Sequence, residues 1–331
     1  MRLGVILAAL LGLAAATAIV GYIGFGQVFA ALSAIGWRGL AFLCFYSALP
    51  FCLLGSAWFV LDKGAPPRQW GVFIWARVIR DSASELLPFS HLGGFVIGAR
   101  AAVLKGVSPT IASSTTIVDV TTEIIAQLGF VGLGLGLLVI RLGVHSTHGG
   151  LVGAVMAGLL LSAAGAAMFI TLQRRGAGLI ERLAVRFLPA AASQAGLVGR
   201  ALHTLYDNPW RLAAAIAVHF TAWVASGIGA WLALRLAGVD IGVDAVLAIE
   251  SLVGAVRSAA FVAPMGIGVQ EATYAVVGPL FGLGPDLSLA LSLLKRARDL
   301  AIGVPALLVW QAQEGLRAVN RPLGGGAGGV E

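Results

Sequence analysis

The sequence carries very little charge for its length. Only 11% of its 331 residues are Asp, Glu, Lys or Arg, whereas 59% are apolar and the mean hydropathy is +0.93. A soluble domain could not cover so much apolar surface with so few polar side chains. Several windows of about 20 residues carry no charge and are long enough to cross a bilayer core of about 30 Å. The chain is therefore predicted to be an all-α polytopic membrane protein.

Cysteine and the common catalytic motifs are also scarce. Cys44 and Cys52 lie in one apolar segment without metal-ligand spacing, and His145 and His148 have no cysteine or carboxylate close by in the sequence. There is no phosphate-binding glycine loop, HExxH or GxSxG. We expect no enzyme activity, metal site or cofactor. The net charge of +7 does not indicate nucleic-acid binding, because the arginines lie in short loops between apolar segments.

Apolar segments predict about six membrane spans. They lie at about 3–23, 39–61, 110–140, 150–172, 211–237 and 286–314. The first resembles a signal peptide, but its apolar run continues to Ile23, so an uncleaved span is expected. Two regions between spans, 70–105 and 243–282, are helix-like but interrupted by proline and glycine, in "SELLPFSHLGG" and "FVAPMGIGVQE".

These two regions are related by a shift of 176 positions. The shift brings together the following pairs: Pro88 with Pro264, Gly106 with Gly282, Pro109 with Pro285, and Ser82-Ala83 with Ser258-Ala259. Because the matching residues are those that end and begin helices, they indicate an internal duplication. We predict repeat one over about 39–140 and repeat two over about 211–314, within a single membrane domain of residues 1–331.

The distribution of positive charge predicts the orientation. If each interrupted region enters the membrane and returns to the same side, three crossings separate the second span from the fifth, and the repeats are inverted. Fifteen Lys and Arg residues then fall on cytoplasmic segments, against three outside, Arg38, Arg141 and Arg257. Both termini are expected to be cytoplasmic. The Arg-, Ala- and Gly-rich composition fits a bacterial inner membrane.

The interruptions are expected to form two re-entrant helical hairpins that gate a path. Irregular backbone inside a membrane is tolerated where protein buries it or where it lines a wet cavity. The candidate gating residues are Glu85, Pro88, His91, Gly93, Gly94, Pro264, Gly266, Gly268 and Glu271. Two interpretations are open for Glu85 and Glu271: they cap exposed N–H groups at the hairpin tips, or they bind protons. His91 is more simply a hydrogen-bonded filler.

Charged residues also fall near the centre of two predicted spans. Asp119 and Glu123 form a polar stripe with Gln127, and the last span carries Lys295, Arg296, Arg298 and Asp299. Unpaired, such charges would cost about 3 kcal/mol each. Either the acids of repeat one pair with the bases of repeat two and lock the repeats together, or the cations bind an anionic lipid head group. In the second hypothesis the three carboxylates are the partners of the cations.

The segment between the repeats, 173–210, contains the basic amphipathic stretch "LIERLAVRFLP". Such a stretch binds anionic lipid of the inner leaflet, here over 173–211, or is a solvated connector; both interpretations remain open. The glycine-rich end, 318–331, is expected to be a flexible tail.

Two quoted stretches carry a family resemblance. "LPFSHLGGFVIGARAAVLKG" followed by "VDVTTE", and "APMGIGVQEAT" followed by "LLKRARD", resemble the flippase-like, lysylphosphatidylglycerol-synthase transmembrane family, in particular its hopanoid-biosynthesis-associated members. The resemblance implies lipid translocation, with Pro264, Gly266, Gly268, Glu271 and Arg298 as the matching motif residues. It implies no lipid aminoacylation, because no aminoacyltransferase sequence follows the membrane region.

The function expected from all of these features is movement of a polar-headed lipid or lipid precursor between leaflets, with a link to hopanoid metabolism from the resemblance alone. The alternatives are a non-transporting scaffold in lipid biosynthesis and an integral membrane enzyme that acts on lipid head groups. The expected partners are membrane lipids, with lipid-biosynthesis enzymes as further candidates.

Overall fold

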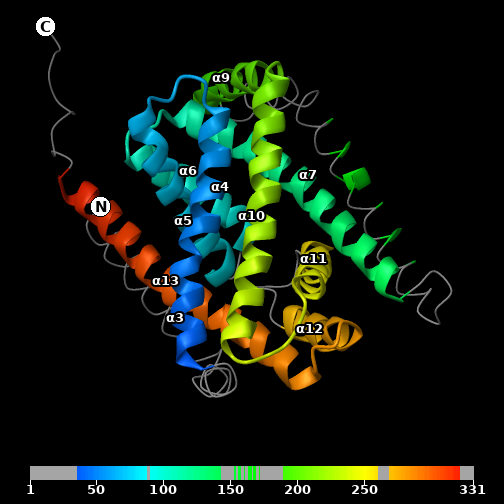
Figure 1. Cartoon of the computed structure of the whole chain (residues 1–331). Coiled ribbons are helices and arrows are strands. Elements are labelled where there is room, and N and C mark those ends of the chain that lie inside the picture. The colour runs from blue at the N-terminus through cyan, green and yellow to red at the C-terminus, as the bar shows by residue number, and fades with distance from the viewer. Residues whose placement is uncertain are drawn as a thin grey trace, which may run out of the picture.

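The computed structural model describes residues 36–87, 90–142, separate positions between 153 and 171, 189–259 and 268–320, and its ordered elements there are helices (Figure 1). In chain order they are α3 (Trp37–Tyr46), α4 (Ala48–Leu61), the 3-10 turn η1 (Pro67–Gln69), α5 (Trp70–Leu86), α6 (Ser90–Leu104), α7 (Pro109–Leu142), α9 (Pro189–Tyr206), α10 (Pro209–Leu236), α11 (Val243–Ala259), α12 (Val269–Leu280) and α13 (Pro285–Asn320). The all-helical prediction is confirmed for the described residues.

Three of the described helical segments are long and apolar enough to cross a membrane. They are Trp37–Leu61, Pro109–Ile140 and Pro209–Leu236, and they coincide with the second, third and fifth predicted spans. The sixth predicted span corresponds to α13, which is long enough but carries more charge. The first predicted span, most of the fourth, the amphipathic stretch before residue 189 and the tail after residue 320 lie outside the described residues.

The two interrupted regions form helical hairpins. α5 and α6 pack along each other, and α11 packs against α12. Each hairpin follows a predicted span and precedes a long helix, so the order of α3/α4, α5/α6 and α7 recurs in α10, α11/α12 and α13. In Figure 1, α4 and α10 run in opposite directions, and the two hairpins lie toward opposite ends of the bundle. The inversion of complete repeats remains a prediction.

The C-terminal ends of the second helix of each hairpin fall at equivalent positions under the shift of 176. α6 ends at Leu104 and α12 at Leu280, and the following glycines, Gly106 and Gly282, have positive φ angles of 98° and 87°. The residue after each glycine donates its backbone N–H five residues back, Val107 to Ala102 and Leu283 to Gly278. This is a Schellman C-cap, which needs a left-handed residue and therefore favours glycine. A proline then begins α7 and α13.

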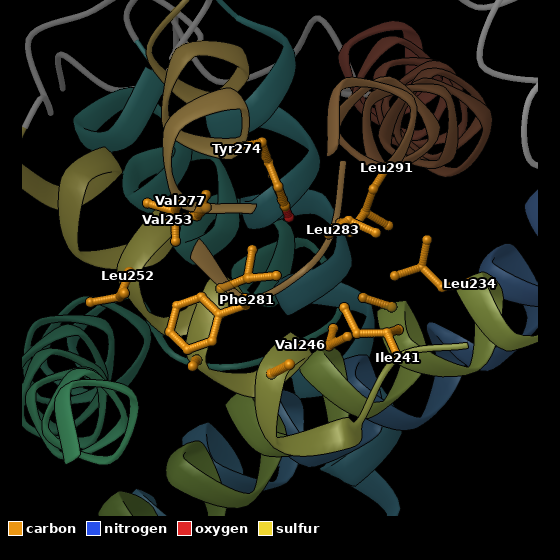
Figure 2. Packing of buried hydrophobic residues seen from close by; sticks show 14 of the residues in the cluster. Leu234, Ile241, Val246, Leu252, Val253, Tyr274, Val277, Phe281, Leu283 and Leu291 are labelled. Atoms are coloured by element: carbon orange, nitrogen blue, oxygen red, sulfur yellow. The ribbon is translucent and has the colours of Figure 1, made fainter. Parts of the chain in front are cut away.

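Each hairpin has an apolar core of its own. Figure 2 shows the core of the second hairpin, where Tyr274, Phe281 and Leu291 meet Val246 and residues from α10. The first hairpin packs around Trp58 and Phe73, whose rings contact edge to face with centroids 5.6 Å apart. The hairpins are therefore held by side-chain packing and not by the turn sequence alone.

Glycines inside α6 allow the arms of the first hairpin to approach closely. A Cβ atom on Gly94 would lie 2.0 Å from Ser84 Oγ, and one on Gly98 would lie 2.6 Å from Arg80 Cβ. The predicted position of the break needs correction here: Gly93 and Gly94 lie within helix α6, as does His91, and the chain turns before them. Pro88, Pro264 and Gly266 lie outside the described residues.

Candidate functional site

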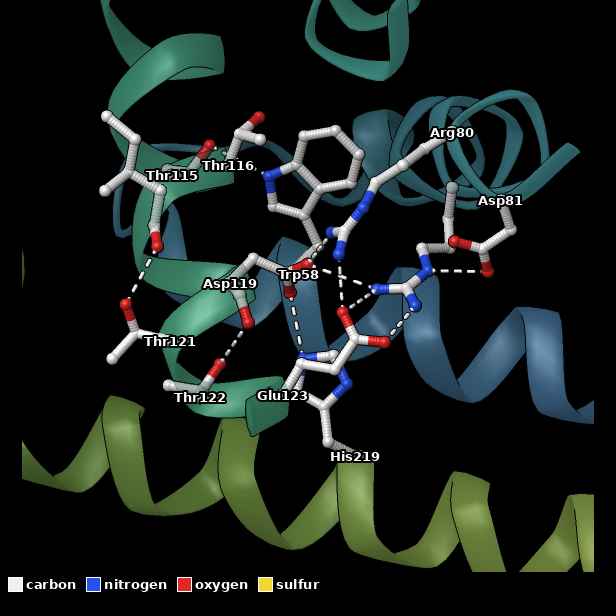
Figure 3. Close-up of polar contacts among 12 residues, drawn as sticks. Trp58, Arg80, Asp81, Thr115, Thr116, Asp119, Thr121, Thr122, Glu123 and His219 are labelled. Carbon is white, nitrogen blue, oxygen red and sulfur yellow. Dashed lines mark hydrogen bonds and ion pairs between the residues drawn. The ribbon is translucent and has the colours of Figure 1, made fainter. Parts of the chain in front are cut away.

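The acids predicted on the third span lie in a buried ion-pair cluster (Figure 3). Arg77 and Arg80 occupy adjacent turns of α5 and reach Asp119 and Glu123 on α7. Arg77 Nη1 lies 3.0 Å from Glu123 Oε2 and 3.3 Å from Asp119 Oδ2. Both arginine side chains are 3% exposed and that of Asp119 is 0% exposed. These ion pairs therefore attach α5, the first helix of the hairpin, to α7.

Two further groups complete this cluster, which we call the first cluster. Asp81 accepts from Arg77 Nε at 2.9 Å, and His219 on α10 places Nε2 3.0 Å from Asp119 Oδ1. Asp119 therefore connects α7 to both α5 and α10. Burial of this many charges is tolerated only where each is paired, as here.

The second hairpin is tied to α13 by a second cluster. Lys295 Nζ donates to Glu250 on α11 and, at 3.1 Å, to the Tyr274 hydroxyl on α12, and that hydroxyl also donates to Glu250. Arg296 pairs with Glu271 at the start of α12. Side chains of α11, α12 and α13 thus contribute to this second cluster.

The two clusters have opposite polarity. In the first repeat the hairpin supplies the cations and the long helix supplies the acids, whereas in the second repeat the hairpin supplies the acids and the long helix supplies the cations. The shift of 176 superimposes Asp119 on Lys295, where the sign is exchanged, and Glu123 on Asp299, where it is kept. In each cluster, described ion pairs join a hairpin to the long helix of the same repeat.

Among the described residues, an ion pair joins the two hairpins near their turns. Arg257 Nη2, near the end of α11, lies 2.7 Å from both carboxylate oxygens of Glu85, near the end of α5. Arg298 and Asp299 on α13 pair with each other, and they interact electrostatically with Glu85 and Arg257, respectively. Charges from α5, α11 and α13 therefore converge where the two hairpins approach each other.

The structure corrects the predicted pairing of the central charges. The described partners of Asp119 and Glu123 are Arg77, Arg80 and His219, and not Lys295, Arg296 or Arg298 of the second repeat. Sequence reasoning placed both arginines of α5 in a cytoplasmic segment, and Arg257 outside. Without these three residues, thirteen cations remain predicted on the cytoplasmic side and two on the outer side, so the charge bias behind the predicted orientation persists.

The capping prediction has a different outcome at each hairpin. Glu271 accepts the N–H of Gly268, the residue before α12, at 2.8 Å, which confirms a cap. Glu85 instead forms an ion pair with Arg257.

The polar stripe of α7 continues as predicted: Gln127 Nε2 donates to Ser258 Oγ at 2.6 Å and to Gly254 O at 3.2 Å, both on α11.

The sequence analysis missed six residues of the site: Arg77, Arg80, Asp81, His219, Arg257 and Tyr274. A signal existed for three of them. Arg77 and Arg80 are spaced to share one face of a helix, and His219 is an ionisable residue inside a predicted span. Tyr274 carried no such signal.

In the described part of the chain, no group of three or more His, Cys, Asp or Glu side chains is placed to hold a metal ion.

One family model matches most of the chain. The model of the lysylphosphatidylglycerol synthase TM region matches residues 5–306, which include both hairpins and both clusters. The chain belongs to this family. Its membership supports a membrane protein of lipid metabolism or translocation. No match was found among curated proteins or among solved structures.

Proposed function

We propose that this member of the lysylphosphatidylglycerol synthase TM-region family moves a polar-headed lipid, or a lipid precursor, between the leaflets of a bacterial inner membrane. The observation that carries the proposal is the ion pair between Glu85 and Arg257. It joins the tips of two helical hairpins inside a bundle with membrane-spanning helices. Hairpins that meet within a membrane are a common way to close a transport path from both sides.

The cations near the tips give the path its selectivity for an anionic group. Arg298 is paired with the adjacent Asp299, and both side chains are slightly less than one-fifth exposed. A lipid phosphate offers at least two anionic oxygens to a guanidinium and competes with a carboxylate for it. The lipid head group would thus exchange with these carboxylates as it passes, while the lipid tails stay in the bilayer.

The same charges bear on the class of lipid. A nearly uncharged hopanoid would gain nothing from four cations, Arg257, Lys295, Arg296 and Arg298, so the transported head group is expected to carry a phosphate or another anion. A hopanoid connection would then be one of shared metabolism and not of the transported group. The amphipathic stretch in 173–210 would bind anionic lipid of the cytoplasmic leaflet, with both termini on that side.

Leaflet exchange of short-chain fluorescent phospholipids in proteoliposomes tests the proposal. We expect exchange by the native protein, and loss of exchange in Arg298→Ala and Glu271→Gln. Arg235→Gln is the matched control, because Arg235 pairs with the 96% exposed Asp240 at the far end of α10 and should not matter. Absence of exchange by folded native protein with anionic, zwitterionic and isoprenoid lipids would favour a scaffold. Formation of a modified lipid would favour an enzyme.

A further inference from the structure

A pocket of about 410 Å³ lies between the end of α4, the loop that follows it and the start of α10. These helix ends lie together at the top of the bundle in Figure 1. The polar lining consists of Asp62, Lys63 and Arg211, and the apolar lining includes Phe59, Trp210 and Ala214. The pocket shares no residue with either cluster or with the ion pair between the hairpins, and translocation assigns it no role.

Two positive side chains of this pocket have donors to spare. Lys63 is exposed and has no hydrogen-bond or ion-pair partner among the described residues. Arg211 donates through Nη1 to the carbonyl of Val60 in the last turn of α4, and no described carboxylate pairs with it. A guanidinium has five N–H groups, so further donors of Arg211 remain. Two such cations at one pocket are suited to a phosphate or another anion.

The carboxylate in the lining is turned toward the loop. Asp62 Oδ1 accepts the backbone N–H of Gly64 at 2.9 Å, in the turn after α4. The lining therefore carries two positive charges and one negative charge, which leaves one positive charge in excess. A ligand with one net negative charge would balance it.

The pocket lies where two candidate membrane spans end. Trp37–Leu61 ends beside it, and Pro209–Leu236 begins there. Trp210 is 79% exposed at this boundary, a depth that tryptophan prefers because its ring is apolar and its N–H can meet water. Phe59 and Ala214 belong to the spans themselves. A ligand in the pocket thus meets cations at the boundary and apolar side chains toward the bilayer core.

We propose that this pocket binds a phospholipid whose head group carries one net negative charge. Lys63 and Arg211 hold the phosphate, and the acyl chains pass along Phe59 and Ala214 into the bilayer. The predicted orientation assigns the lipid to the cytoplasmic leaflet, in which anionic lipids give the surface a negative potential. Because the pocket joins α4 to α10, the lipid connects the leading spans of the two predicted repeats. The inference does not rest on lipid translocation.

Native mass spectrometry of the purified protein in a neutral detergent tests the choice of head group. The probes are phosphatidylglycerol and phosphatidylcholine with the same acyl chains. We expect phosphatidylglycerol to bind at least about tenfold more tightly, because its head group lacks the ammonium that Lys63 and Arg211 repel. Equal affinities for the two lipids would overturn the proposal.

Lys63→Gln and Arg68→Gln are a matched pair of variants. Lys63→Gln should weaken binding of phosphatidylglycerol at least about fivefold, because it removes a charged donor to the phosphate. Lys63 has no partner among the described residues, so its replacement should leave the fold intact. Arg68 lies in η1 and does not line the pocket, so Arg68→Gln should change the affinity less than about twofold. Equal losses would show attraction by surface charge alone and would overturn the proposal.

Asp62→Asn tests the charge argument in the opposite direction. An amide oxygen can still accept the N–H of Gly64, so the turn is kept while the pocket loses its negative charge. The affinity for phosphatidylglycerol should rise at least about threefold. Asp240→Asn, on a 96% exposed side chain, is the control and should leave the affinity unchanged. Unchanged or weaker binding in Asp62→Asn would contradict the proposal.

Competition distinguishes a lipid from a soluble phosphate compound. Glycerol 3-phosphate presents a phosphate on glycerol without acyl chains. Added in large excess at constant ionic strength, it should leave phosphatidylglycerol bound, because the acyl chains contribute apolar contacts with the protein. Displacement of the lipid by glycerol 3-phosphate would indicate a site for a soluble phosphate compound and would overturn the assignment to a lipid.

Discussion

Glu85 and Arg257 come from hairpins in different halves of the chain, 172 positions apart, and form an ion pair with two contacts of 2.7 Å. Both side chains are about one-quarter exposed. Each lies within a few residues of the turn of its hairpin. The pair thus connects the elements that the proposed translocation has to separate, and it is the first place to test that account.

Exchange of the two charges should separate the ion pair from its individual residues. Glu85→Arg and Arg257→Glu should each lower the free energy of unfolding by about 2 kcal/mol, because each leaves like charges facing one another. The double variant should recover at least half of the summed loss. Unfolding of the purified protein, followed by thermal or denaturant titration, measures the coupling. Additive losses in the double variant would mean that the pair does not hold the tips together.

Two neighbouring glycines in α6 provide a matched test of hairpin packing. Gly94→Ala should destabilise the protein by about 1–3 kcal/mol, because its Cβ would lie 2.0 Å from Ser84 Oγ and 2.8 Å from Arg80 O. A Cβ atom on Gly93 would have no atom within 4 Å, so Gly93→Ala should be neutral or should stabilise the protein by up to about 1 kcal/mol. Melting temperatures of the two variants give the comparison. Equal effects would place the arms of the hairpin further apart than described.

The paired C-caps predict equal effects in both halves of the chain. Gly106→Ala and Gly282→Ala should each cost about 1–2 kcal/mol, since φ angles of 98° and 87° are unfavourable for a residue with a Cβ atom. Gly71→Ala, at a helical position with free space, is the control and should not destabilise. The two losses should add in the double variant because the sites are independent. A large loss of stability at one cap alone would argue against an internal repeat.

The hairpins and their exits could be predicted because their signals are local. Proline removes a backbone donor and glycine permits a left-handed turn wherever they occur, so a shift of 176 aligned real helix ends at Leu104 and Leu280. The same reliance on local signals led to the wrong prediction of a helix break at Gly93 and Gly94. Gly93 and Gly94 suggest a break by composition, but Gly94 is needed where α6 contacts α5.

The partners of the central charges could not be predicted in the same way. Which acid meets which base depends on how helices distant in sequence pack, and no local rule links Arg77 to Glu123 or His219 to Asp119. A count of loop charges also treats every arginine outside a predicted span as solvated. It therefore assigned Arg77 and Arg80 to the cytoplasm, although α5 carries them into the bundle.

Reversible crosslinking of the two hairpins would show whether the lipid path runs between them. In a background where Cys44 and Cys52 are replaced by serine, Glu85→Cys and Arg257→Cys together accept a short reducible thiol crosslinker in place of the ion pair. The account predicts that leaflet exchange in proteoliposomes stops in the crosslinked protein and returns after reduction, while crosslinker applied to either single variant has no effect. Exchange that continues with the tips crosslinked would contradict a path between the hairpins.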